Sequence, residues 1–149
     1  MTAQTIPVSH ESDGSTAKPL RRHLITASRV LLGCIFLVFG LNGFLNFLPQ
    51  PANVPEGALA FGGALFKTGY MFPLIKGTEI VVGALLLSNR FVPLALALVA
   101  PIVVNIFAFH AFLAPAGVGL AAVIVALEAY LAWTYRDAYQ PMLAGRFKS

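Results

Sequence analysis

The stretch MFPLIKGTEIVVGALLLS, residues 71–88, decides the fold of this chain. It approaches the length of about 20 mostly apolar residues that an α-helix needs to cross a bilayer, yet it holds Lys76 and Glu79 three residues apart. An ionisable side chain at bilayer depth costs about 2.5 to 3.5 kcal/mol, so such groups are normally kept for a partner, a pathway or a bound molecule. We therefore predict a membrane-spanning helix that carries a site.

Three further stretches have a similar length and apolar character. The 149 residues are 58% hydrophobic and 11% charged, whereas a soluble domain carries about a quarter charged residues. This composition excludes an ordinary soluble domain and predicts an all-α integral membrane four-helix bundle. The predicted spans are residues 30–48, 71–88, 91–113 and 117–135.

The segment between the first two spans is longer than a turn requires. In PANVPEGALAFGGALFKTGY, residues 51–70, Pro55 suits the first helical position and Glu56 the positive end of a helix. Lys67 suits the negative end, and Gly69 can stop the helix. We predict a short amphipathic helix on the outer membrane surface, with an irregular loop as the alternative.

The distribution of cations predicts the orientation, because Lys and Arg near span ends are retained in the cytoplasm. One side of the four-span arrangement receives Lys18, Arg21, Arg22, Arg29, Arg90, Arg136, Arg146 and Lys148. Only Lys67 falls on the other side, so both termini are predicted to be cytoplasmic. The net charge of +4 is thus a topology signal, and no nucleic-acid partner is expected.

The chain divides into three parts by composition. Residues 1–23 are predicted to be a disordered cytoplasmic tail, because the first 19 are rich in Ser, Thr and Pro and have no apolar run. Residues 24–143 form the four-span membrane domain, and residues 144–149 form a second cytoplasmic tail. The first span is expected to act as an uncleaved insertion signal.

Each predicted span contributes a polar side chain near the middle of the membrane. At 1.5 Å per residue these groups fall into one layer. The predicted site consists of Asn42, Lys76, Glu79, Asn105 and Glu128. Lipid offers no hydrogen-bond partner, so the layer should face the interior of the bundle, where Lys76 and Glu79 can pair directly. The alternative is that these polar groups only hold helices together.

The remaining reactive residues exclude several classes of protein. Cys34 is the single cysteine, so a thiol or disulfide enzyme is not expected. His110 lies near the outer end of the third span and is a possible contact there, while His23 lies at the inner end of the first. Two axial haem ligands would have to meet across the membrane, so haem is not expected either. No residues have metal-ligand spacing, and no metal is predicted.

Several motifs make the chain resemble the DoxX-like family of bacterial membrane proteins over about residues 25–143. They are the TGYMFP entry and the Glu79-x-x-x-Gly83 core of the second span, with the FHAFLAP and WTYR segments near the third and fourth. This resemblance implies a small four-helix bundle in the bacterial inner membrane. Some relatives are named for a subunit of thiosulfate:quinone oxidoreductase, and others associate with redox partners.

Two classes of function remain open at this stage. In the first, the protein is a membrane subunit or partner of a quinone-linked redox system, and the polar layer accepts a quinone head group or relays protons. In the second, it is a non-enzymatic bundle that binds or transports a small solute or assists assembly. An enzyme acting by itself is not favoured, since no redox cofactor site can be recognised. The lipid bilayer is a partner in both classes.

Overall fold

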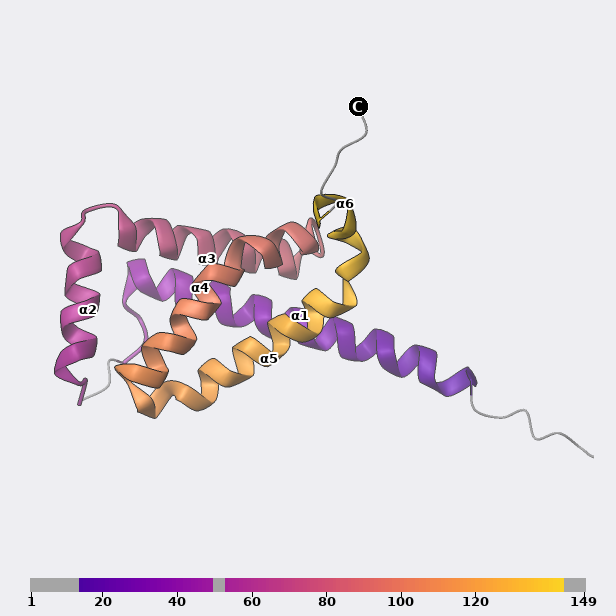
Figure 1. Ribbon diagram of the computed structural model, residues 1–149, viewed down its shortest axis with the longest axis horizontal. Helices are drawn as coiled ribbons and strands as arrows, with labels where there is room; N and C mark the ends of the chain where they lie inside the picture. Colours follow the sequence, from indigo (N-terminus) through magenta and orange to yellow (C-terminus); the bar gives the residue numbers. More distant parts are fainter. Residues whose placement is uncertain (1–13, 50–52, 144–149) are drawn as a thin grey trace, which may run out of the picture.

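The computed structural model describes residues 14–49 and 53–143, and all regular secondary structure within these ranges is helical (Figure 1). The long helices are α1 (Gly14–Leu45), α2 (Glu56–Lys67), α3 (Met71–Leu87), α4 (Val92–Phe112) and α5 (Val118–Thr134). The short elements are the 3₁₀ turns η1 (Pro115–Gly117) and η2 (Arg136–Ala138) and the helix α6 (Gln140–Leu143). The predicted all-α class is confirmed for the described residues.

The four predicted spans correspond to α1, α3, α4 and α5, with boundaries that differ mainly at the start of α1. Within the described residues, three helices are long and apolar enough to cross a membrane: Pro19–Leu45, Val92–Phe112 and Pro115–Thr134. The pair α2 and α3 qualifies as a fourth candidate when the two are taken together, and they are bent by 93°. The number of candidate spans is therefore three or four.

Helix α1 begins upstream of its predicted start. Residues 14–23 are helical, so the prediction of a disordered tail through residue 23 is wrong for this part. The physical reason is that Leu20, Arg21 and Leu24 are good helix formers, and a helix that is already nucleated extends easily. The other predicted tail residues, 1–13 and 144–149, lie outside the described residues.

Helix α2 confirms the predicted helix between the first two spans and excludes the irregular loop. The carbonyl of Pro55 accepts hydrogen bonds from the amides of Ala58 and Leu59 at 3.0 and 3.1 Å, which starts the helix. At the other end, Gly69 has a φ of 76°, a conformation that glycine adopts without steric cost. The chain can therefore turn sharply from α2 into α3.

The four longest helices run alternately toward and away from α2, which crosses one end of the molecule (Figure 1). Helix α3 packs along α1, α4 contacts both α3 and α5, and α5 returns to α1. We name the two ends of this arrangement the α2 end and the turn end, the latter being residues 88–91.

The hydrophobic core lies toward the turn end. Its members on α3 lie at or after Val82, and those on α4 lie at or before Val103. The cluster consists of Leu32, Phe36, Val82, Leu86, Val92, Ala95, Leu96, Val99, Val103, Ile124 and Leu131. The half of the molecule next to α2 is consequently less tightly filled.

Glycines at positions 33, 40 and 83 bring α1 and α3 into close contact. A Cβ atom added to Gly83 would stand 2.6 Å from the amide nitrogen of Leu37. It would also stand 2.9 Å from the carbonyl oxygen of Gly33. The two backbones therefore touch where no side chain intervenes.

Arg29 of α1 is buried at the turn end, with 8% of its surface exposed. Its guanidinium donates hydrogen bonds to the carbonyl oxygens of Leu86 and Leu87, the latter at 3.4 Å. The last carbonyls of a helix have no partner within the helix, so Arg29 caps the end of α3. The sequence indicated only that Arg29 is a topology signal.

We expect Arg29→Met to lower the free energy of unfolding in detergent by about 2 kcal/mol. The change keeps an apolar chain of similar length and removes the charged donor from carbonyls that are shielded from water. Thermal or denaturant unfolding followed by circular dichroism would measure the loss. Arg22→Met is the control, because Arg22 is exposed on the same helix and should tolerate the change. Equal losses in the two variants would contradict the capping role.

Candidate functional site

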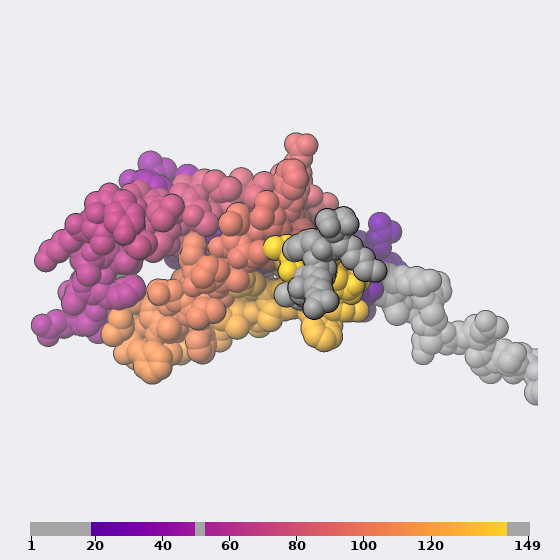
Figure 2. Space-filling view, turned by 45° about the horizontal axis from the view of Figure 1, so that its top comes forward, coloured from indigo at the N-terminus to yellow at the C-terminus, as the bar shows by residue number. Residues whose placement is uncertain are grey.

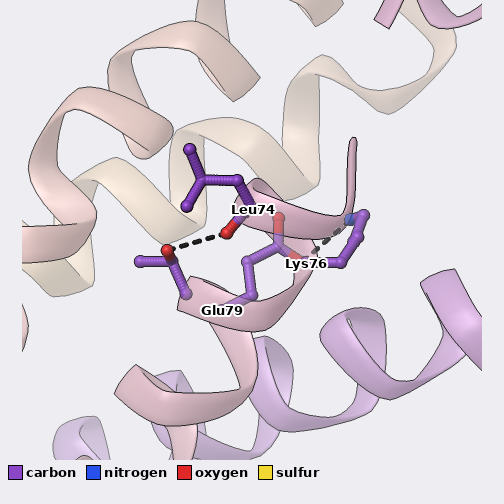
Figure 3. A network of polar contacts seen from close by, with 4 residues as sticks. Leu74, Lys76 and Glu79 are labelled. Atoms are coloured by element: carbon purple, nitrogen blue, oxygen red, sulfur yellow. Dashed lines mark hydrogen bonds and ion pairs between the residues drawn. The ribbon is translucent and has the colours of Figure 1, made fainter. Parts of the chain in front are cut away.

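Lys76 and Glu79 form an ion pair on one face of α3 (Figure 3). The Lys76 Nζ atom donates to the Glu79 Oε2 atom at 2.8 Å. The Glu79 side chain is 3% exposed, whereas that of Lys76 is 22% exposed. The predicted pairing is therefore confirmed, and the carboxylate is the more deeply buried partner.

Two glycines of α1 make room for this pair. A Cβ atom on Gly43 would stand 2.5 Å from the Cγ atom of Lys76, so the lysine stem lies directly over that glycine. A Cβ atom on Gly40 would stand 3.1 Å from the Cβ atom of Glu79. Because both side chains pass close to the α1 backbone, the helix contact that joins α1 to α3 also positions the ion pair.

A cavity of about 400 Å³ lies beside the ion pair, between α2, α3 and α4. Figure 2 shows an opening between α2 and α4 on the side of the molecule where this cavity lies. Its apolar lining consists of Phe61, Gly62, Leu65, Phe72, Ile75, Pro101, Ile102, Ile106 and Phe109. Its polar lining consists of Lys76, Glu79, Asn105 and His110. We call this space the larger cavity, because it is the larger of the two that contact the ion pair.

A second cavity of about 160 Å³ lies between α1, α3, α4 and α5. We call it the smaller cavity, and its own lining is apolar: Ile35, Phe36, Phe39, Leu120, Ala121 and Ile124. It shares Lys76, Glu79, Ile106 and His110 with the larger cavity. The ion pair thus stands between the two cavities.

His110 lies in the last turn of α4, where it lines both cavities. Its Nδ1 atom lies 2.8 Å from the carbonyl oxygen of Ile106, one turn earlier on α4. The opposite edge of the ring lies against Gly117, where an added Cβ would collide with the His110 Cδ2 and Nε2 atoms. His110 also lines a cavity of about 440 Å³ formed with residues 53–55 and the turn between α4 and α5. His110 therefore lines this third space as well as the two cavities beside the ion pair.

The structure brings only part of the predicted polar layer together. Asn105 lines the larger cavity with Lys76 and Glu79, but its side chain is exposed at the open side. Asn42 does not line either cavity. Its side-chain oxygen accepts a hydrogen bond from the amide of Leu48 at 2.7 Å and so satisfies the chain just after the end of α1. The expectation that Asn42 faces a shared site is therefore wrong.

Glu128 is buried on α5, with 8% of its surface exposed, but it also lies outside both cavities. It is close to Tyr139, whose hydroxyl donates to the carbonyl oxygen of Pro93 at 2.9 Å. Burial chiefly, and then the charge of Glu128, raises the pKa of Tyr139. Glu128 therefore lies on the side of the molecule toward the turn end. Its burial agrees with the prediction that it faces the interior of the bundle, but Glu128 does not share a cavity with Lys76 and Glu79, because depth in a helix does not specify which neighbour a side chain faces.

The apolar walls of the cavities were not identified from the sequence. A usable signal was present, since Ile102, Ile106 and His110 recur at intervals of four residues and must share one face of α4. Gly117, which accommodates the histidine ring, also gave no sequence signal. Its importance depends on the turn between α4 and α5, which folds it back onto His110.

The chemistry available at the site is that of one ion pair, one imidazole and one amide in a largely apolar enclosure. Among the described residues, no group of three or more His, Cys, Asp or Glu side chains could hold a metal ion. Cys34 is a free thiol and is exposed on α1, away from the cavities. The cavity linings therefore offer hydrogen-bonding groups beside apolar surface.

No family model matches this sequence, and no curated protein or solved structure matches it significantly. The DoxX-like resemblance consequently stays a prediction. The function has to be argued from the geometry of the site.

Proposed function

We propose that this protein is a DoxX-like four-helix bundle of the bacterial inner membrane that binds the head group of a quinone-type molecule. In this proposal it acts as a membrane subunit or partner of a redox system. The observation that carries the proposal is the buried Lys76–Glu79 pair in the wall of a cavity of about 400 Å³. Polar groups at bilayer depth are characteristic of sites and pathways.

The outer surface of the helices supports a place in lipid. Large apolar side chains are exposed on every long helix. A lipid-facing surface requires such side chains, whereas a soluble monomer rarely exposes them in large patches. Examples are Leu31 on α1, Leu74 on α3, Val104 on α4 and Val123 on α5. With α3 as the second span, both termini and the turn end face the cytoplasm, because the cations gather there. Helix α2 then lies at the periplasmic surface.

The lining of the larger cavity suits a quinone head group. Its volume is within the range of about 300 to 1,000 Å³ that is usual for small-molecule sites. Phe61, Phe72 and Phe109 offer aromatic surface to a flat ring. The Lys76 ammonium has three donors and uses one on Glu79, so it can donate to a carbonyl oxygen of the ring. The open side next to α2 and α4 would leave room for an apolar tail.

A second candidate function is the binding or transport of a small solute. It is favoured by the smaller cavity, because a polar pair standing between two spaces is an arrangement that a translocation path would also have. A small anion could contact Lys76 in this case. The two candidates differ in the ligand that should accompany the purified protein.

We expect the protein purified in mild detergent to contain quinone that organic solvent extracts and absorbance detects. We also expect Gly62→Leu to weaken binding of a short-chain quinone about tenfold, because the new side chain would occupy part of the larger cavity. Titration calorimetry would measure the affinity.

Gly63→Leu is the matched control. Both glycines lie on α2 and have nothing within 4 Å of an added Cβ, but Gly63 does not line the larger cavity. Glu79→Gln keeps the size of the side chain and removes its charge. It is a second variant for the same affinity measurement. Protein that holds no quinone and binds none would contradict the quinone proposal and favour the solute-binding alternative.

A further inference from the structure

The hydrogen bond of His110 determines which of its ring nitrogens carries the proton. A carbonyl oxygen can only accept, so the Nδ1 atom that lies 2.8 Å from the carbonyl oxygen of Ile106 must be the donor. In a neutral imidazole the other nitrogen then has no proton. His110 consequently presents Nε2 as a hydrogen-bond acceptor.

This acceptor lies at the ring edge next to Gly117 and has no partner among the described residues. The Nε2 atom makes no hydrogen bond with another described residue, yet no buried side-chain nitrogen or oxygen in the described part of the chain lacks a partner. The Nε2 atom is therefore not fully buried. His110 lines both the larger and the smaller cavity, in each case together with Lys76 and Glu79.

We infer that the site selects a molecule that carries a hydroxyl group, which donates to His110 Nε2 while an oxygen accepts from Lys76. This inference rests on the proposed function and refines it. The preferred ligand is a hydroquinone, the reduced form of a quinone, because a quinone has only acceptor oxygens. His110 is then a specificity-determining residue of the site.

Gly117 contributes to this selectivity, because it leaves room for the ring of His110. Its backbone has φ −94° and ψ 0°, which an alanine can adopt. Alanine is nevertheless excluded by space, since its Cβ would collide with the ring edge that carries Nε2. Gly117→Ala must therefore displace the imidazole while leaving its chemistry unchanged. This variant tests the position of the ring separately from its identity.

The test compares a short-chain hydroquinone with its dimethyl ether, which lacks the two hydroxyl donors and carries two additional methyl groups. With the full-length protein in detergent and oxygen excluded, titration calorimetry should show the hydroquinone binding about tenfold more tightly. His110→Phe and Gly117→Ala should abolish this ratio. His110→Gln, which supplies an acceptor oxygen, should retain part of it.

Matched controls are His23→Phe and Gly119→Ala. His23 is exposed on α1, and nothing lies within 4 Å of a Cβ added to Gly119, so both variants should keep the wild-type ratio. Equal binding of the two probes to the wild-type protein would overturn the inference and leave the proposed function intact. Failure of both probes and of the parent quinone to bind would overturn the proposed function itself. A purely structural role of His110 would weaken both probes equally and would also contradict the inference.

Discussion

Replacing Lys76 by methionine should lower the free energy of unfolding in detergent by about 3 kcal/mol. The methionine preserves the stem that lies over Gly43 but leaves the carboxylate of Glu79 buried without its cation. Removal of one partner from a buried ion pair is strongly destabilising, since the remaining charge loses both its partner and the solvation it would have in water. Denaturant unfolding followed by circular dichroism would measure the effect.

A double-mutant cycle separates the pair from the individual side chains. We expect Lys76→Met combined with Glu79→Gln to be more stable than Lys76→Met, because the second change removes the isolated charge. Lys67→Met is the control for loss of a cation, since Lys67 is exposed on α2. If the two changes were additive to within about 0.5 kcal/mol, Lys76 and Glu79 would not be energetically coupled.

This cycle also distinguishes a functional pair from one that only supports the fold. A variant that regains stability without regaining ligand binding would show that the charges serve the bound molecule. A variant that regains both would show that the cavity shape is sufficient. The two quantities should be measured on the same protein preparations.

The second large effect is expected for Gly83→Ala, which should destabilise the protein by about 3 kcal/mol. The new methyl group would press against the backbone of α1 at Gly33 and Leu37. Backbone atoms cannot rotate away as a side chain can, so the two helices would have to separate. Loss of this contact should also disturb the ion pair, because its position depends on the same approach of α1 and α3.

Gly77→Ala is the matched control on the same helix. Nothing lies within 4 Å of a Cβ added at that position, and alanine favours a helix interior over glycine by up to about 1 kcal/mol. Its unfolding midpoint should be unchanged or slightly higher, whereas that of Gly83→Ala should fall. A similar response of the two variants would show that α1 and α3 do not meet at Gly83.

The helices themselves could be predicted from local composition. Long apolar runs bounded by Arg90 and by the turn residues near Gly117 are enough to place α3, α4 and α5 to within a few residues. The start of α1 was harder to predict, because polar residues upstream of a span can either continue the helix or form a non-helical segment. The pairing of Lys76 with Glu79 was also predictable, since residues three apart share a helix face.

Which of the other polar residues share a cavity with the ion pair could not be predicted in this way. Asn42, Asn105 and Glu128 lie at similar calculated depths, but depth along a helix says nothing about its rotation relative to the neighbouring helices. In the structure, Asn42 accepts a hydrogen bond from the amide of Leu48, just after the end of its own helix. Glu128 lies outside the cavities, close to Tyr139. Rotation follows from how side chains interlock across helices, which is a property of the whole packed core.

By itself, the sequence determined which segments are helical and apolar, and which two charges meet on α3. These are local properties, since a helix needs only its own backbone hydrogen bonds and neighbours three residues apart. Only the tertiary structure decided that Lys76 lies over Gly43, that Gly117 accommodates the ring of His110, and that the space beside α2 stays open. These features depend on contacts between segments far apart in the chain, where the fit of one surface against another selects the arrangement.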